Sequence, residues 1–201
     1  MRRALVLAAL LLFGGIAAAS QTTLTGAEGH PRFRLPLRLH VASFGDAGLD
    51  EAAARAVDDW NALAREVLAT SVFATVVRAQ DAQIVVRVEP PAASGLMGVT
   101  EVESDGGIIR LPVRIAIVAP QPRGQVNRDL VLYQVVAHEL GHALGLAHAA
   151  DPRSLMCCAS GQVNLDDPAT REAYLAARRR PDVRSVSAQL TEHYRRIWGP
   201  R

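Results

Sequence analysis

The chain has 201 residues, with 22 basic and 20 acidic side chains, a formal net charge of +2 and two cysteines. This length suffices for one domain with a substantial core. The near balance of charge argues against nucleic acid or an acidic membrane surface as the main partner, and two cysteines exclude a disulfide framework.

Residues 1–19 have the pattern of a signal peptide. Arg2 and Arg3 precede an apolar run over residues 4–16, and three alanines at 17–19 offer a small-residue cleavage site before Ser20. The run is too short for a transmembrane helix, and no other apolar stretch approaches the ~20 residues that a span needs. We expect an exported protein, secreted or periplasmic, with no membrane span after signal cleavage; a retained N-terminal anchor is the alternative.

The next part of the chain begins with an arm, a strand and a helix. The polar residues 20–31 suggest a flexible arm, after which residues 32–201 are expected to form a single domain. Alternating apolar and polar residues over 33–43 predict a strand. Apolar residues at helical spacing over 49–68 predict an amphipathic helix, with Trp60 in the core.

Further strands are expected before the middle of the chain. The β-branched runs at 72–77 and 84–88 predict two strands, and residues 95–102 predict another short one. After a turn at 105–107, residues 108–118 predict a strand in which Pro112 indicates an irregularity or an edge.

Helices dominate the second half. Asn127 predicts the N-cap of a helix that is apolar around most of its circumference and is therefore central. Asp167-Pro168 predicts the start of a helix that runs to about Arg180, in which the arginines at 178–180 form a solvated face. A last helix closes the chain. This order indicates an α+β or α/β fold, with helices packed on one twisted, mostly parallel sheet.

One stretch has the spacing of metal ligands. Residues 138–148 read H-E-x-x-H-x-x-G-x-x-H. His138 and His142 are four residues apart, so a helix places both imidazoles on one face, where they can share a metal ion. Glu139, the residue after His138, lies about 100° round the helix from it. It is poorly placed as a ligand but can reach a water at the metal, which is the position of a general base.

Gly145 allows a third ligand to join them. A continuing helix would carry His148 off the metal-binding face, but glycine accepts positive φ and commonly ends helices, so the chain can turn back there. Three neutral nitrogens leave a fourth position open, which is typical of a catalytic zinc site. The expected chemistry is hydrolysis, in which zinc lowers the pKa of a water to roughly 7 and Glu139 takes its proton.

The motif and the following Ser154-Leu155-Met156 resemble the metzincin zinc endopeptidases, and among them most the matrixin catalytic domain. The resemblance implies a zincin fold with a twisted five-stranded, mostly parallel sheet, an antiparallel edge strand and an active-site helix. It places Met156 in a turn that forms an apolar floor under the zinc, and a C-terminal helix at 190–199. It divides the domain into an upper part, 32–145, and a lower part, 146–201.

The same resemblance implies the substrate. In the family, an extended peptide or protein segment pairs with the edge strand of the sheet as an additional strand. Residues 95–101 match that strand by the order of elements.

The chain departs from the matrixin pattern after Met156. Cys157 and Cys158 stand where tyrosine and proline are usual. The segment 159–184, which precedes the last helix, is longer than expected for the family. The cysteines fit two small, half-buried apolar residues; an intermolecular bridge, a vicinal disulfide and a reactive thiol are alternatives. The residues between the predicted cleavage site and the first strand hold no cysteine, so we expect no cysteine switch.

We therefore expect an exported zinc endopeptidase, monomeric by default, with one catalytic zinc. The predicted ligands are His138, His142 and His148, and Glu139 is the predicted base and then acid. Calcium would fit the family, but no pattern identifies its ligands, and no second cluster of histidine and aspartate predicts a structural zinc.

Two alternatives belong to other classes. One is a secreted binding protein that holds zinc without turnover, which the altered region after Met156 favours. The other is a zinc amidase that acts on bonds outside proteins. His30, His40 and His193 lack ligand-like spacing and are expected at the surface or in ordinary structural roles.

Overall fold

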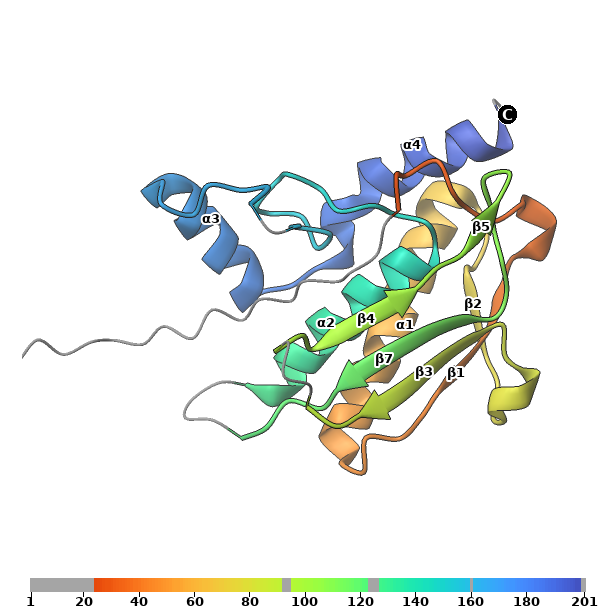
Figure 1. The fold of residues 1–201 in the computed structure, drawn as a ribbon, viewed down its shortest axis with the longest axis horizontal. Coiled ribbons are helices and arrows are strands. Elements are labelled where there is room, and N and C mark those ends of the chain that lie inside the picture. Colours follow the sequence, from red (N-terminus) through yellow and green to blue (C-terminus); the bar gives the residue numbers. More distant parts are fainter. Residues whose placement is uncertain (1–23, 92–94, 123–126, 160, 200–201) are drawn as a thin grey trace, which may run out of the picture.

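We analysed a computed structural model of the chain, which describes residues 24–91, 95–122, 127–159 and 161–199. The predicted signal peptide at 1–19 lies outside these residues. Figure 1 shows one large sheet, two long helices packed along it, and a region after residue 143 that lies to one side of the sheet.

The five-stranded sheet has the predicted mixed topology. Its strand order is β2-β1-β3-β7-β4, and the first four strands are parallel. Strand β4 lies at one edge and runs antiparallel to β7, with Gly98 opposite Ile117 and Thr100 opposite Ile115. The strand bounds are β1 Leu37–Val41, β2 Phe73–Thr75, β3 Ile84–Glu89, β4 Gly98–Glu101 and β7 Val113–Val118. The prediction of an α+β fold with an antiparallel edge strand is confirmed.

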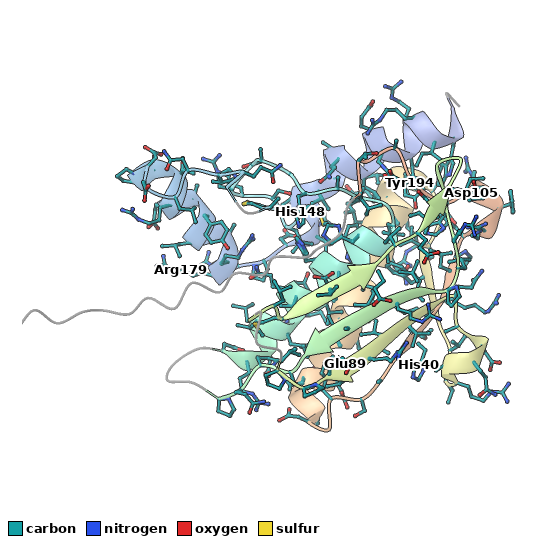
Figure 2. The ribbon with its side chains drawn as sticks, in the orientation of Figure 1. His40, Glu89, Asp105, His148, Arg179 and Tyr194 are labelled. Carbon is teal, nitrogen blue, oxygen red and sulfur yellow. A yellow bond between two sulfur atoms is a disulfide. The ribbon has the colours of Figure 1, made fainter. Side chains whose placement is uncertain are left out.

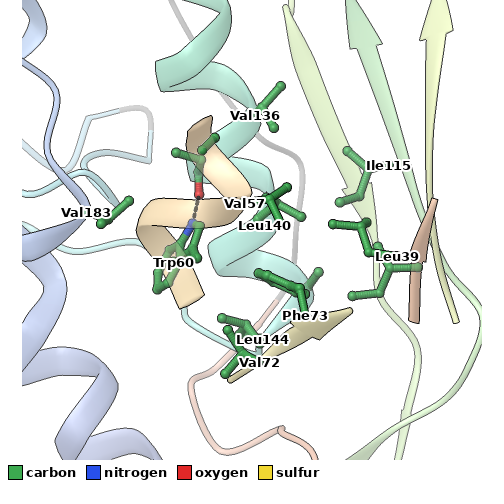
Figure 3. Packing of buried hydrophobic residues seen from close by; sticks show 14 of the residues in the cluster. Leu39, Val57, Trp60, Val72, Phe73, Ile115, Val136, Leu140, Leu144 and Val183 are labelled. Carbon is green, nitrogen blue, oxygen red and sulfur yellow. Dashed lines mark hydrogen bonds between the residues drawn. The ribbon is translucent and has the colours of Figure 1, made fainter. Parts of the chain in front are cut away.

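Helices α1 (Ala47–Leu68) and α2 (Arg128–Ala143) pack together against one face of the sheet. Asp46 caps α1 by accepting hydrogen bonds from the backbone of Gly48 and Leu49. Trp60 is fully buried, as predicted, and its Nε1 donates to the carbonyl of Ala137, 2.8 Å away (Figure 3). This bond and the removal of large apolar side chains from water fix the second helix against the first.

Two of the predicted strands that are shorter than expected contain proline. The segment 33–43 yields only β1, preceded by the short helix η1 (Arg32–Arg34). The segment 108–118 divides into β6 (Ile108–Ile109), which pairs with β5 (Ser104–Asp105), and β7. Pro36 and Pro112 have no N–H to donate to a ladder, which explains why strands begin only after them.

The arm predicted as flexible is packed against the domain in its last residues. The Gly29 N–H donates to the Gly107 carbonyl (2.9 Å), and the Ile109 N–H donates to the Gly29 carbonyl (3.0 Å). His30 is fully buried. The expectation of a flexible arm up to residue 31 therefore does not hold at Gly29, whose backbone pairs with a segment about eighty positions away.

Three further helices follow α2 in the described residues. They are α3 (Pro168–Arg179), the short helix η3 (Val183–Val186) and α4 (Ser187–Trp198), which packs on α1. Asp167 caps α3, as predicted, and accepts from the Thr170 N–H. Figure 1 shows α3 well away from the sheet. None of the helices in the described residues is long and apolar enough to cross a membrane.

Candidate metal centre

The three predicted ligands come together in space. His138 Nε2 lies 3.1 Å from His142 Nε2 and 3.3 Å from His148 Nε2. His138 and His142 are buried, and His148 is half-buried. Across the described ranges, these residues form the one group of three or more histidine, cysteine or acidic side chains that could share a metal ion.

The end of α2 explains how His148 joins the two helical histidines. Gly145 has φ +94°, its N–H donates to the His142 carbonyl (2.9 Å), and the Leu146 N–H donates to the Gly141 carbonyl (3.0 Å). These two bonds are the Schellman arrangement that closes a helix. The chain then reverses, and His148 faces the helix it has just left, as the Gly145 prediction required.

Backbone carbonyls set the tautomers of the two helical ligands. His138 Nδ1 lies 2.8 Å from the Leu155 carbonyl, and His142 Nδ1 lies 2.7 Å from the Leu146 carbonyl. A carbonyl only accepts, so each Nδ1 carries the proton and each Nε2 presents a lone pair. These lone pairs converge, which is unfavourable unless a cation lies between them.

The spacing fits zinc. Two nitrogens that each lie about 2.0–2.1 Å from a tetrahedral zinc are about 3.3 Å apart, which matches the two contacts that His138 makes. Nitrogen ligands held through their second ring nitrogen are typical of catalytic zinc sites. The residues present therefore fit the metal that the sequence predicts.

The electrostatics keep the ligands neutral. Burial lowers the pKa of His138 to about 4. Burial, with the neighbouring His138 and His148, lowers the pKa of His142 to about 2. Burial also lowers the pKa of His148. Since a protonated imidazole cannot bind a metal, these shifts leave all three nitrogens ready for zinc at neutral pH.

Glu139 projects from the next position of α2, toward the edge strand. Its side chain is buried, and the Thr100 hydroxyl donates to Oε2 over 2.6 Å. Thr100 is not among the residues predicted from the sequence. The only signal was the alternation in β4, which places Gly98 and Thr100 on the same, buried face.

Met156 packs against α2, the helix that carries two of the predicted ligands; its place under the zinc stays a prediction. It is fully buried, and a Cβ added at Gly141 would overlap its sulfur. The Ala149 N–H donates to the Met156 carbonyl (2.9 Å) and closes the loop that carries His148. The methionine is therefore tied both to the helix with two ligands and to the loop with the third.

The two cysteines after Met156 were predicted as small, half-buried apolar residues, and the structure joins them instead. Cys157 and Cys158 are joined as a vicinal disulfide, which was one of the alternatives. Arg178, predicted on a solvated face, is partly buried and donates from Nη2 to the Cys157 carbonyl (2.6 Å). The expectation of solvent exposure is wrong for Arg178, because α3 folds back onto this turn.

The other histidines lie outside the cluster. His30 Nε2 bonds to the Ala143 carbonyl (2.9 Å), and His193 is buried between α4 and the end of α2. His40 lies on β1, and Figure 2 shows it far from His148. The expected structural role fits His30 and His193, both of which are buried.

Comparison with known proteins identifies a family whose sequence pattern this chain matches. The sequence model of the peptidase family described as matrixin matches residues 42–168, which is more than half of the chain. The match includes the whole of α1, the edge strand, α2, the three histidines and Met156. No curated protein matches the sequence significantly.

Proposed function

From the premise that this chain belongs to the matrixin family of zinc metallopeptidases, we propose that it is exported and cleaves internal peptide bonds with Glu139 as its general base. The proposed ligands are His138, His142 and His148. The observation that supports this most directly is the convergence of three histidine Nε2 atoms beside a buried carboxylate.

The proposed chemistry divides between the metal and the chain. Zinc, when bound, supplies a Lewis acid that polarises a carbonyl and makes a water more acidic. Glu139 accepts the proton of the attacking water and holds it on its carboxylate. It then gives the proton to the nitrogen of the leaving amine, so one side chain serves as base and then as acid.

The proposed substrate is an extended peptide segment. Within the described residues, β4 pairs with β7 on one side and with no strand on the other. Its residues Gly98 and Thr100 face α2 and Glu139. A peptide that adds to this edge by backbone hydrogen bonds would run beside the site, and side-chain pockets would then set its register.

Two observations support export. The predicted signal sequence begins the chain, and the Cys157–Cys158 disulfide suits an oxidising compartment such as the periplasm or the extracellular space. Residues 32–201 would then act as one catalytic domain, with the zinc site between its upper and lower parts.

The experiment is zinc analysis and cleavage of an unbiased peptide library by the chain from Ser20 and by its Glu139→Gln variant. We expect about one zinc per chain in both, and cleavage by the parent alone. The amide of glutamine keeps the size of the carboxylate but cannot accept the proton. Zinc in both proteins with no cleavage by either would contradict the peptidase proposal and favour a zinc-holding binding protein.

A further inference from the structure

We propose that Thr100 is the positioning residue that holds Glu139 in its working orientation, an inference that rests on the proposed peptidase function. The contact joins the edge strand to the active-site helix across 39 positions of sequence. It gives the chain a specific link between the strand that would receive substrate and the base that would take the proton of the attacking water.

The geometry of the contact is that of a strong hydrogen bond. Thr100 Oγ1 lies 2.6 Å from Glu139 Oε2, and both side chains are 2% exposed. A hydroxyl that donates to a carboxylate over 2.5–2.7 Å forms a charge-assisted bond, and burial strengthens it further. A flexible glutamate is thereby restricted to one rotamer.

The strand itself is held firmly. Thr100 pairs with Ile115 of β7, the neighbouring strand, whose other side pairs with β3. Ile115 is part of the buried core. The Thr100 hydroxyl is therefore attached to a rigid element rather than to a loop, which is what precise placement of a reacting group requires.

Gly98 completes the placement from the same face of β4. A Cβ at Gly98 would lie 2.6 Å from Glu139 Oε1, 2.7 Å from its Cγ and 2.8 Å from Val135 Cγ1. Real carbon atoms do not approach so closely. The absence of a side chain at position 98 thus leaves the space that the Glu139 side chain occupies, while Thr100 fixes its end.

The hydroxyl can serve Glu139 in both of its protonation states. Thr100 Oγ1 also lies 3.1 Å from the backbone carbonyl of Glu139. When the carboxylate is ionised, the hydroxyl donates to Oε2. When Glu139 holds the proton taken from water, it can donate that proton to Oγ1 as a hydrogen bond, and the hydroxyl can turn its own hydrogen to the backbone carbonyl.

The first test compares Thr100→Val with Thr100→Ser. Valine keeps the shape and removes the hydroxyl, whereas serine keeps the hydroxyl. We expect Thr100→Val to lower kcat by about 10- to 100-fold with little change in KM, and Thr100→Ser to recover most of kcat. Thr191→Val makes the same chemical change at an exposed position of α4 and should leave kcat unaltered.

A second measurement does not depend on turnover. Melting temperatures are compared for the parent, Thr100→Val, Glu139→Ala and the double variant, all freed of metal with a chelator. Thr100→Val should lower the melting temperature in the parent by more than it does in the Glu139→Ala background, because the second background has no carboxylate to bond.

The outcomes separate the two proposals. If the parent cleaves peptides and Glu139→Gln does not, but Thr100→Val cleaves like the parent, the role of Thr100 is overturned and the peptidase stands. Equal melting shifts in both backgrounds would overturn it as well. If the parent itself cleaves nothing, the peptidase proposal fails, and the positioning role fails with it.

Discussion

The sulfur of Met156 lies directly against the backbone of Gly141, in the last turn of α2 and between its two histidines, His138 and His142. A Cβ at position 141 would also lie 3.2 Å from Cζ2 of Trp60. A glycine in a helix interior costs about 1 kcal/mol relative to alanine. The close approach of Met156 and Trp60 explains why this position nevertheless holds glycine.

Gly141→Ala should therefore destabilise the protein despite its higher helix propensity. Overpacking of this kind costs about 1–3 kcal/mol, which lowers the melting temperature of a domain of this size by several degrees. Displacement of Met156 should also weaken zinc binding. Gly48→Ala, in the first turn of α1, is the matched control, since its Cβ would meet only carboxylate oxygens, those of Asp129 at 3.3 Å and of Asp46 at 3.4 Å. Equal melting temperatures for the two variants would contradict the packing argument.

Zinc should stabilise the folded chain through His148 as well as through the two helical histidines. At a zinc concentration 100 times the Kd, binding adds about 2.7 kcal/mol to the free energy of unfolding. Melting curves with zinc and with a chelator measure this gain. His148→Ala should lose most of it, whereas His40→Gln, far from the site in Figure 2, should keep it. A full zinc-dependent shift in His148→Ala would remove His148 from the ligand set.

His30 should make the fold sensitive to acid. Burial lowers its pKa from 6.5 to about 4, and the hydrogen bond to the Ala143 carbonyl only partly opposes this. The unfolded chain therefore takes up a proton near pH 6.5 that the folded chain resists. The contribution of neutral His30 to the free energy of unfolding is complete above pH 6.5. It is lost as the pH falls toward 4, at up to about 1.4 kcal/mol per pH unit.

The variant His30→Gln tests this assignment, because an amide can still donate to Ala143 but does not titrate. Urea unfolding at several pH values between 7 and 4 gives the free energy of unfolding of each protein. We expect a shallower decline in His30→Gln. The other buried histidines are the same in both proteins, so the difference between the two curves isolates His30. If the free energy of unfolding declines equally with falling pH in both proteins, another group is responsible for the acid sensitivity.

The part of the site that could be predicted from the sequence is the part that is local. His138 and His142 share a helix face because of the 3.6-residue period, and Gly145 ends the helix through its own positive φ. Each of these features depends on residues within one or two turns. The resemblance to matrixins then supplied Met156 and the antiparallel edge strand of the sheet.

The remaining features depend on contacts between distant segments. Thr100 meets Glu139 across 39 positions, and Gly29 pairs with Gly107 through backbone groups that leave no pattern in the side chains. Arg178 belongs to an arginine run that looks solvent-exposed in sequence. Only the folded chain shows which of these polar groups has a buried partner.

Arg178 should hold α3 against the turn that follows Met156. No residue of α3 is buried, so the helix has little apolar contact with the rest of the domain. Arg178 donates to the Cys157 carbonyl over 2.6 Å, and its guanidinium lies 4.4 Å from the centre of the Tyr174 ring. A hydrogen bond from a charged group contributes about 1.5–3 kcal/mol, which is enough to decide whether such a helix stays docked.

Arg178→Ala should therefore release α3 while the sheet and the zinc ligands stay folded. Hydrogen exchange measured by mass spectrometry should become faster over residues 168–179 and stay unchanged over α2. Arg179→Ala is the matched control, because Arg179 is exposed and its pairing with Glu172 over 3.5 Å at the surface contributes little. If both variants exchange like the parent, α3 is held by contacts other than Arg178. If α2 also exchanges faster in Arg178→Ala alone, the bond to Cys157 supports the metal centre itself, because Cys157 directly follows Met156.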